Sequence, residues 1–124
     1  MHAGRLSGVA FGLMTQGGLP VAPTEIELDR QGRRLLFSWA DGRRSAYDWE
    51  YLRWRCPCAW CAGEGGRPGA LEGRESLTPD ETTMTDINLV GRYAVQPTWQ
   101  DNHDTGMFTF RALRAMAEQD GLLE

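Results

Sequence analysis

The chain has 124 residues, of which 41% are hydrophobic and 24% are charged, and its formal net charge is -4. This length suits one domain, and the composition is that of an ordinary globular protein, which excludes wholesale disorder and a fibrous repeat. No apolar run approaches the roughly 18 residues that span a bilayer, and the N-terminus has no secretory signal pattern. We therefore expect a cytoplasmic protein.

The charge is unevenly distributed along the chain. Residues 30–55 hold seven Arg against three acidic residues, and all 13 basic residues of the chain are Arg. A basic stretch can bind nucleic acid or an acidic partner. Arginines spread over hairpin turns are more often a solvated surface, so we do not expect nucleic-acid binding.

Residues 1–22 are predicted to form a flexible N-terminal leader, because Gly and Pro recur there without apolar periodicity. The folded domain is predicted over residues 23–120. From Thr24 onward, apolar and polar residues alternate in three short runs that are separated by the Asp29–Gly32 and Asp41–Gly42 turns. This pattern predicts three antiparallel strands.

Residues 63–83 are rich in Gly, Glu, Pro and Thr and are predicted to be a mobile, irregular loop. Strand-like segments resume at residues 86–90 and 93–95. A final helix is expected after Thr109 as N-cap, ending before Gly121. The predicted fold is α+β, with a small antiparallel sheet of about five to six short strands, a C-terminal helix packed on it, and a metal-bound loop.

Three cysteines lie within the hexapeptide Cys56-Pro57-Cys58-Ala59-Trp60-Cys61. An odd number of cysteines cannot all form disulfides, and a bond between Cys56 and Cys58 would close a very small, strained ring. Thiolates suit soft or borderline metal ions, and a distant His commonly completes a tetrahedral site. His103 is the candidate, because the other histidine, His2, lies in the predicted leader.

Other interpretations of these residues remain open. Cys58 and Cys61 could be a redox pair, although no strand–helix–strand unit surrounds them, and the cysteines could be buried apolar residues. His103 could be an ordinary surface residue. Its neighbours Asp101 and Asp104 could orient the imidazole or cap the turn, and Trp54, Trp60 and Trp99 could form an apolar shell around a metal or be ordinary core.

A set of short motifs, taken in order, resembles the gamma-butyrobetaine hydroxylase-like N-terminal domain, long described as a domain of unknown function, over about residues 23–117. The motifs are Pro23-Thr24-Glu25-Ile26, Trp39-Ala40-Asp41-Gly42, Leu52-Arg53, Cys56-Pro57-Cys58-Ala59-Trp60-Cys61, Gly91-Arg92-Tyr93-Ala94, Trp99-Gln100-Asp101-Asn102-His103-Asp104-Thr105-Gly106 and Leu113-Arg114. The resemblance implies a zinc ion held by Cys56, Cys58, Cys61 and His103. Asn102 stands where the family usually has Gly, and Asn tolerates the left-handed backbone angles of such a turn.

The family also occurs before the oxygenase domain of carnitine-pathway hydroxylases and fused to ATPases that carry iron–sulfur clusters. We therefore expect a stand-alone, bacterial-type member that acts as a non-catalytic interaction module with a structural zinc and another protein as partner. The alternative is an accessory protein that binds or assembles an iron–sulfur cluster, with iron or a cluster on the same ligands. An oxygenase needs two His and a carboxylate, which this chain cannot supply, so we do not expect an enzyme.

Overall fold

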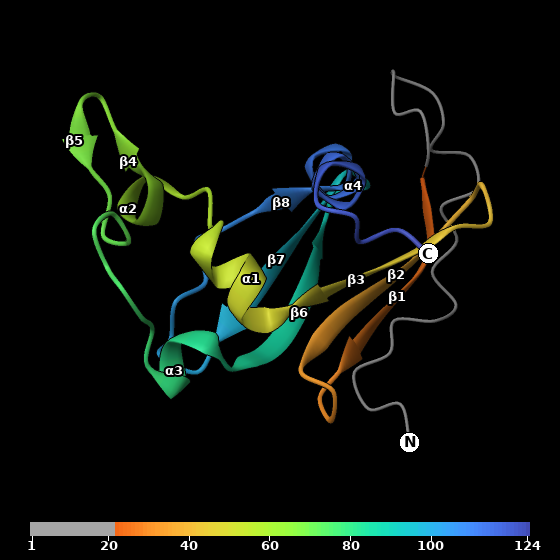
Figure 1. Ribbon diagram of the computed structural model, residues 1–124, viewed down its shortest axis with the longest axis horizontal. Helices are drawn as coiled ribbons and strands as arrows, with labels where there is room; N and C mark the ends of the chain where they lie inside the picture. The colour runs from red at the N-terminus through yellow and green to blue at the C-terminus, as the bar shows by residue number, and fades with distance from the viewer. Residues whose placement is uncertain (1–21) are drawn as a thin grey trace.

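The structure, a computed structural model, describes residues 22–124 (Figure 1). The predicted leader thus lies outside the described residues except for Ala22, and its flexibility stays a prediction. Ala22 is fully buried, and its carbonyl accepts a hydrogen bond from the Ala40 N–H at 2.8 Å. The ordered domain therefore includes this residue.

The first half of the domain is a three-stranded antiparallel meander followed by a helix. Strands β1 (Pro23–Asp29), β2 (Arg34–Trp39) and β3 (Arg44–Asp48) pair in sequence order. Helix α1 (Trp49–Trp54) begins directly after β3. The three strands predicted from alternation are confirmed. Alternation identifies such strands because one face of an antiparallel sheet is buried and the other faces solvent.

The second half repeats this plan. Strands β6 (Met84–Val90), β7 (Ala94–Trp99) and β8 (Phe108–Thr109) form the other three-stranded antiparallel sheet, and helix α4 (Phe110–Gln119) follows β8 directly. The Thr109 side chain accepts the Ala112 N–H at 3.0 Å, which confirms the predicted N-cap. No helix within residues 22–124 is long and apolar enough to cross a bilayer.

An insertion separates the two halves. It contains α2 (Ala59–Ala62), a two-stranded hairpin of β4 (Gly63–Glu64) and β5 (Arg67–Pro68), and the short helix α3 (Pro79–Thr82). Figure 1 shows α2, β4 and β5 standing apart from the two sheets, and we call residues 59–68 the arm.

The stretch at residues 63–83 contains short regular elements, so the prediction that it is irregular throughout is wrong. Besides the hairpin of the arm, it contains α3, which begins with a capping box. The Thr78 hydroxyl accepts the Glu81 N–H at 3.4 Å, and the Glu81 carboxylate accepts the Thr78 N–H at 2.8 Å.

The strand registers show that the two halves are built alike. In the first half Pro23 lies opposite Trp39 and the register shifts at the next step. In the second half Met84 lies opposite Trp99 and the register shifts at the same place. The two meanders therefore match with an offset of 60 or 61 positions.

Hydrogen bonds at the start of each helix follow the same offset. The Trp49 N–H donates to the Arg33 carbonyl at 3.1 Å, and the Phe110 N–H donates to the Tyr93 carbonyl at 2.8 Å. Both bonds attach the first residue of a helix to the turn before the second strand of its own meander. The chain is therefore an internal structural repeat with an insertion between its copies.

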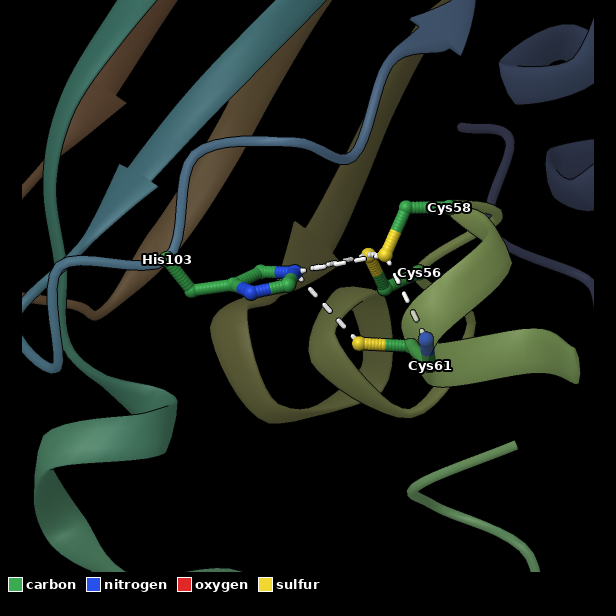
Figure 2. A group of neighbouring side chains, drawn as sticks. All are labelled: Cys56, Cys58, Cys61 and His103. Carbon is green, nitrogen blue, oxygen red and sulfur yellow. Dashed lines mark hydrogen bonds between the residues drawn. The ribbon is translucent and has the colours of Figure 1, made fainter.

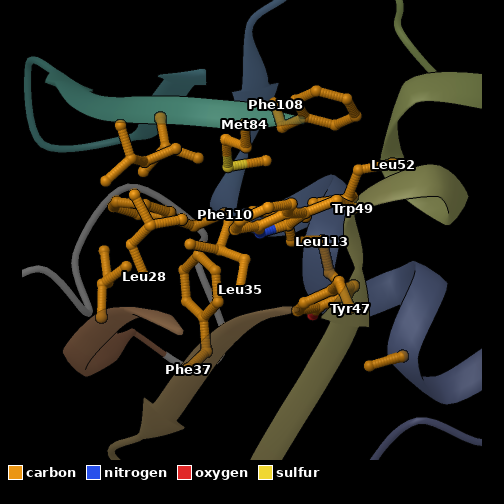
Figure 3. Packing of buried hydrophobic residues seen from close by; sticks show 14 of the residues in the cluster. Leu28, Leu35, Phe37, Tyr47, Trp49, Leu52, Met84, Phe108, Phe110 and Leu113 are labelled. Carbon is orange, nitrogen blue, oxygen red and sulfur yellow. The ribbon is translucent and has the colours of Figure 1, made fainter. Parts of the chain in front are cut away.

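One apolar cluster unites the two halves. Figure 3 shows side chains from both meanders and from α1 and α4 packed against one another, including Phe37, Trp49, Phe108, Phe110 and Leu113. The α+β class and the C-terminal helix are confirmed. The strands form two three-stranded sheets and a hairpin rather than one sheet.

A buried hydrogen-bond chain fastens α4 to the first meander. Trp39 Nε1 donates to Ser45 Oγ at 2.8 Å, Ser45 Oγ donates to the Tyr47 hydroxyl at 3.0 Å, and that hydroxyl donates to the Leu113 carbonyl at 2.7 Å. Burial raises the pKa of Tyr47. The chain satisfies polar groups that would otherwise be costly inside the core.

We predict that Tyr47→Phe lowers the free energy of unfolding by about 1–3 kcal/mol, because it leaves the Ser45 hydroxyl and the Leu113 carbonyl short of a partner. Urea denaturation measures this loss. Tyr93→Phe is the matched control, since Tyr93 is 52% exposed, and it should change stability by less than about 0.5 kcal/mol. Equal effects of the two changes would contradict the role of the buried chain.

Candidate metal centre

The four residues that the sequence singled out lie together. Figure 2 shows Cys56, Cys58 and Cys61 facing His103 across the gap between α2 and the loop after β7. Their ligand atoms all lie within 4.8 Å of one another. His103 Nε2 is 3.4 Å from the sulfurs of Cys56 and Cys61 and 3.5 Å from that of Cys58.

The three nitrogen–sulfur distances fit a single tetrahedral metal ion. Zinc–sulfur bonds of about 2.3 Å and zinc–nitrogen bonds of about 2.0–2.1 Å imply ligand-to-ligand edges of roughly 3.5–3.8 Å. The sulfurs of Cys56 and Cys58 are 3.5 Å apart. One imidazole nitrogen has a single proton or lone pair and cannot hydrogen-bond well with three thiols, so their convergence points to a shared central ion.

The ends of two short helices position the cysteines. The Cys56 N–H donates to the Arg53 carbonyl at 3.1 Å, which places Cys56 just past the end of α1. Cys58 is the N-cap of α2, and its sulfur accepts the Cys61 N–H at 3.4 Å. Cys58 and Cys61 are therefore brought to one side by a single helical turn.

A tight turn after β7 positions His103. The Asn102 N–H donates to the Trp99 carbonyl at 2.9 Å, and the Trp99 N–H donates to the His103 carbonyl at 2.9 Å. Asn102 has φ 67°, in the left-handed region that Asn tolerates better than most residues. The expected turn therefore forms with Asn in place of Gly.

The protein environment shifts the pKa values of the thiols in different directions. Burial raises the pKa of Cys56 and of Cys61. Burial also acts to raise the pKa of Cys58, but hydrogen bonds from the Thr105 hydroxyl and the Cys61 N–H outweigh it, so the pKa of Cys58 is lowered. A metal ion would have to displace the remaining thiol protons, and binding would release them.

The imidazole is suited to ligation. Burial, together with the positive charge of Arg53, lowers the pKa of His103. A lowered pKa favours the neutral ring, which is the form that binds metals.

Asp101 caps the turn rather than orienting the imidazole. Its Oδ1 accepts the backbone N–H of His103 at 3.3 Å, and its two carboxylate oxygens also accept hydrogen bonds from Arg53 at 3.1 and 3.0 Å. Asp104 contributes its main-chain carbonyl, which accepts a hydrogen bond from the Gln96 side chain.

The three tryptophans near the ligands have different environments. Trp99 is buried, Trp54 is half-buried, and Trp60 is 73% exposed. The expectation that Trp60 shields a metal or belongs to the core is therefore wrong, because it lies on the outer side of the single-turn helix α2.

Sequence reasoning missed three residues that build the site. Arg53 connects to both the cysteine and histidine segments, and the Thr105 hydroxyl lies 3.4 Å from His103 Nε2. A Cβ on Gly106 would lie 2.4 Å from the Cys56 sulfur, so only glycine fits there without displacing the ligand. All three belong to motifs that carry the family resemblance, but their type alone suggests no contact with a metal site.

Several solved structures are similar to this chain. One is a crystal structure of a protein of unknown function of the DUF971 family from Acidithiobacillus ferrooxidans ATCC 23270, with 34% identity, a TM-score of 0.57, and coverage of 76% of this chain and 90% of that chain. A solution NMR structure has 29% identity, a TM-score of 0.61, and coverage of 85% and 74%.

Another solution NMR structure, at 22% identity, has a TM-score of 0.57 and coverage of 81% of this chain and 75% of that chain, and it supports the fold alone. No curated protein matches the sequence. The sequence model of the family described as gamma-butyrobetaine hydroxylase-like, N-terminal, matches residues 26–114. The chain belongs to the gamma-butyrobetaine hydroxylase-like N-terminal family, of which DUF971 is the former name.

Proposed function

We propose that the chain is a non-catalytic interaction module in which Cys56, Cys58, Cys61 and His103 hold one structural zinc ion. The observation that carries the proposal is the compact set of three sulfurs around one imidazole nitrogen, at 3.4–3.5 Å. Three thiolates and one imidazole suit zinc and fill its four positions. A closed site of this kind stabilises a fold and leaves no position for substrate.

Such an ion would join parts of the chain that are distant in sequence. The cysteines follow α1 of the first half, whereas His103 follows β7 of the second half. A cross-link across residues 62–102 removes conformational freedom from the unfolded chain. Because Cys58 is the N-cap of α2 and Cys61 lies within that helix, the ion would also fix the arm against the rest of the domain.

The alternative to zinc is an iron–sulfur cluster bound by the same four residues. A two-iron cluster divides its four protein ligands between two irons. All four ligand atoms here lie within 4.8 Å of one another, and this compactness favours a single ion.

The histidine content of the described residues argues against one class of enzyme, the iron oxygenases. The described residues include one histidine, His103, and its ring nitrogen already faces the three sulfurs. An iron oxygenase centre of two His and one carboxylate therefore has no second histidine in this part of the chain.

The interaction role is supported by Trp60 on the arm. Its side chain is 73% exposed and lines a shallow groove of about 490 Å³ together with Pro68 and Ala70. Exposed aromatic residues are enriched at sites where proteins bind one another. By resemblance to the family, the partner would be an oxygenase or an ATPase that carries iron–sulfur clusters.

We predict about one zinc ion per chain and no visible absorbance for protein produced without added metal or an affinity tag. His103→Ala should lose most of the zinc because it removes one of four ligands, as elemental analysis would show. Asp104→Asn is the control, since this exposed neighbour lies outside the donor set, and it should retain the metal. Iron with sulfide and a brown colour would favour the cluster instead, and no metal under reducing conditions would contradict both.

We predict that Trp60→Ala abolishes binding to the oxygenase or ATPase partner in calorimetric titrations but changes the free energy of unfolding by less than about 0.5 kcal/mol. The exposed ring makes little contribution to the core, so its loss should affect recognition alone. Tyr93→Ala replaces another exposed aromatic, in the turn between β6 and β7, and should leave binding intact. Undiminished binding by the Trp60 variant would refute the role of the arm.

A further inference from the structure

Two arginine clamps of the same construction join the halves of the repeat. Each clamp consists of an Arg from a helix, a Trp that ends a strand, and an Asp two positions after that Trp. The Arg53 clamp comprises Arg53, Trp99 and Asp101, and the Arg114 clamp comprises Arg114, Trp39 and Asp41.

The geometry of the two clamps is closely matched. Arg53 donates to both carboxylate oxygens of Asp101 at 3.1 and 3.0 Å, and Arg114 donates to both of Asp41 at 3.3 and 2.8 Å. Each guanidinium carbon lies 5.4 Å from the ring centroid of its tryptophan. Paired fork-like contacts of this kind need arginine and are not reproduced by lysine.

The clamps reach across the repeat in opposite directions. Arg53 belongs to the first half and binds Asp101 of the second, whereas Arg114 belongs to the second half and binds Asp41 of the first. Such reciprocal contacts are those of an interface between two equivalent units.

Only the Arg53 clamp is connected to the candidate metal centre. The Arg53 carbonyl accepts the Cys56 N–H at 3.1 Å, and the Asp101 carboxylate accepts the His103 N–H at 3.3 Å. One ion pair therefore contacts both segments that supply ligands. The Arg53 guanidinium also donates to the Glu81 carbonyl at 2.8 Å, and its charge acts on the thiols of Cys56 and Cys61.

The Arg114 clamp has no ligands at the corresponding positions. Asp41 accepts the Arg43 N–H at 3.2 Å, so Arg43 stands where His103 stands in the other half. Helix α4 continues past Arg114, and Ala117 occupies the position that corresponds to Cys56. The repeat thus supplies a copy of the clamp without a metal site.

We propose that Arg53 is a positioning residue of the metal centre, which holds Cys56 and His103 in place before the ion binds. The inference rests on the proposed metal-binding function. Fixing the ligands in advance reduces the conformational freedom lost on binding, and partners of metal ligands commonly raise affinity by about 10- to 100-fold. The guanidinium charge also offsets the excess negative charge of three thiolates beside a divalent ion.

The test compares equivalent substitutions in the two clamps. Arg53→Lys and Arg114→Lys keep the positive charge but lose the paired hydrogen bonds to the Asp carboxylate, so both should lower the melting temperature. The zinc dissociation constant of each folded variant is measured by competition with a chelator. We expect Arg53→Lys to weaken zinc binding about 10- to 100-fold and Arg114→Lys to change it less than about threefold.

A second pair of variants keeps the test informative if the lysine variants do not fold. Asp101→Asn retains an oxygen for the His103 N–H but loses the charged pair with Arg53, and Asp41→Asn is its counterpart in the other half. The visible bands of the cobalt-loaded proteins report ligand geometry directly. These bands should shift in Asp101→Asn and remain unchanged in Asp41→Asn.

The outcomes separate the positioning role from the proposed function. The positioning role would be overturned by equal zinc affinities for the two lysine variants or by unshifted cobalt bands in Asp101→Asn. Zinc binding by the wild-type protein would still support the proposed metal-binding function. Failure of the wild-type protein to bind zinc would overturn both.

Discussion

The fold depends on the packing of its two three-stranded meanders against each other. A small sheet with one apolar face is not stable alone and must cover that face with another layer. Here each meander and its helix contribute to one shared cluster, which includes Phe37 from the first half and Phe108 from the second. Each half therefore supplies the cover for the apolar face of the other.

Different contacts hold the two halves of the domain together at the two ends of their interface. At one end the Arg53 clamp lies beside the proposed metal centre. At the other end the Arg114 clamp lies beside a longer helix, and the C-terminal tail adds to β3, with the Glu124 N–H donating to the Arg44 carbonyl at 2.7 Å. The proposed metal ion beside the Arg53 clamp and the C-terminal tail beside the Arg114 clamp would thus each hold the two halves together at one end of their interface.

This asymmetry links stability to the proposed function. The metal-side end is where the arm leaves the domain, and its exposed Trp60 stands one residue before Cys61. An ion that closes this end would also determine how Trp60 is presented to a partner. Loss of the ion would then affect recognition even with the shared core intact.

The sequence predicted the features that depend on local patterns. Alternation identified the first meander, and Thr109 and Gly121 bounded the last helix. The crowded cysteines, with the one histidine outside the predicted leader, singled out the candidate ligands that the structure brings together. These signals are strong because periodicity and residue chemistry act over short distances.

The remaining features depend on distant contacts. The repeat rests on a few matched positions, such as Trp39 with Trp99 and Leu52-Arg53 with Leu113-Arg114, and an insertion separates them. The exposure of Trp60 could not be predicted because a four-residue helix has too few residues to show an amphipathic pattern.

The most direct test of the account is X-ray absorption at the zinc edge on the purified protein. We expect one zinc with three sulfur neighbours at about 2.3 Å and one nitrogen neighbour at about 2.0–2.1 Å, with no second metal nearby. A water or other oxygen among the first neighbours would contradict a closed structural site, and a second metal in the neighbouring shell would contradict a single ion joining the two halves.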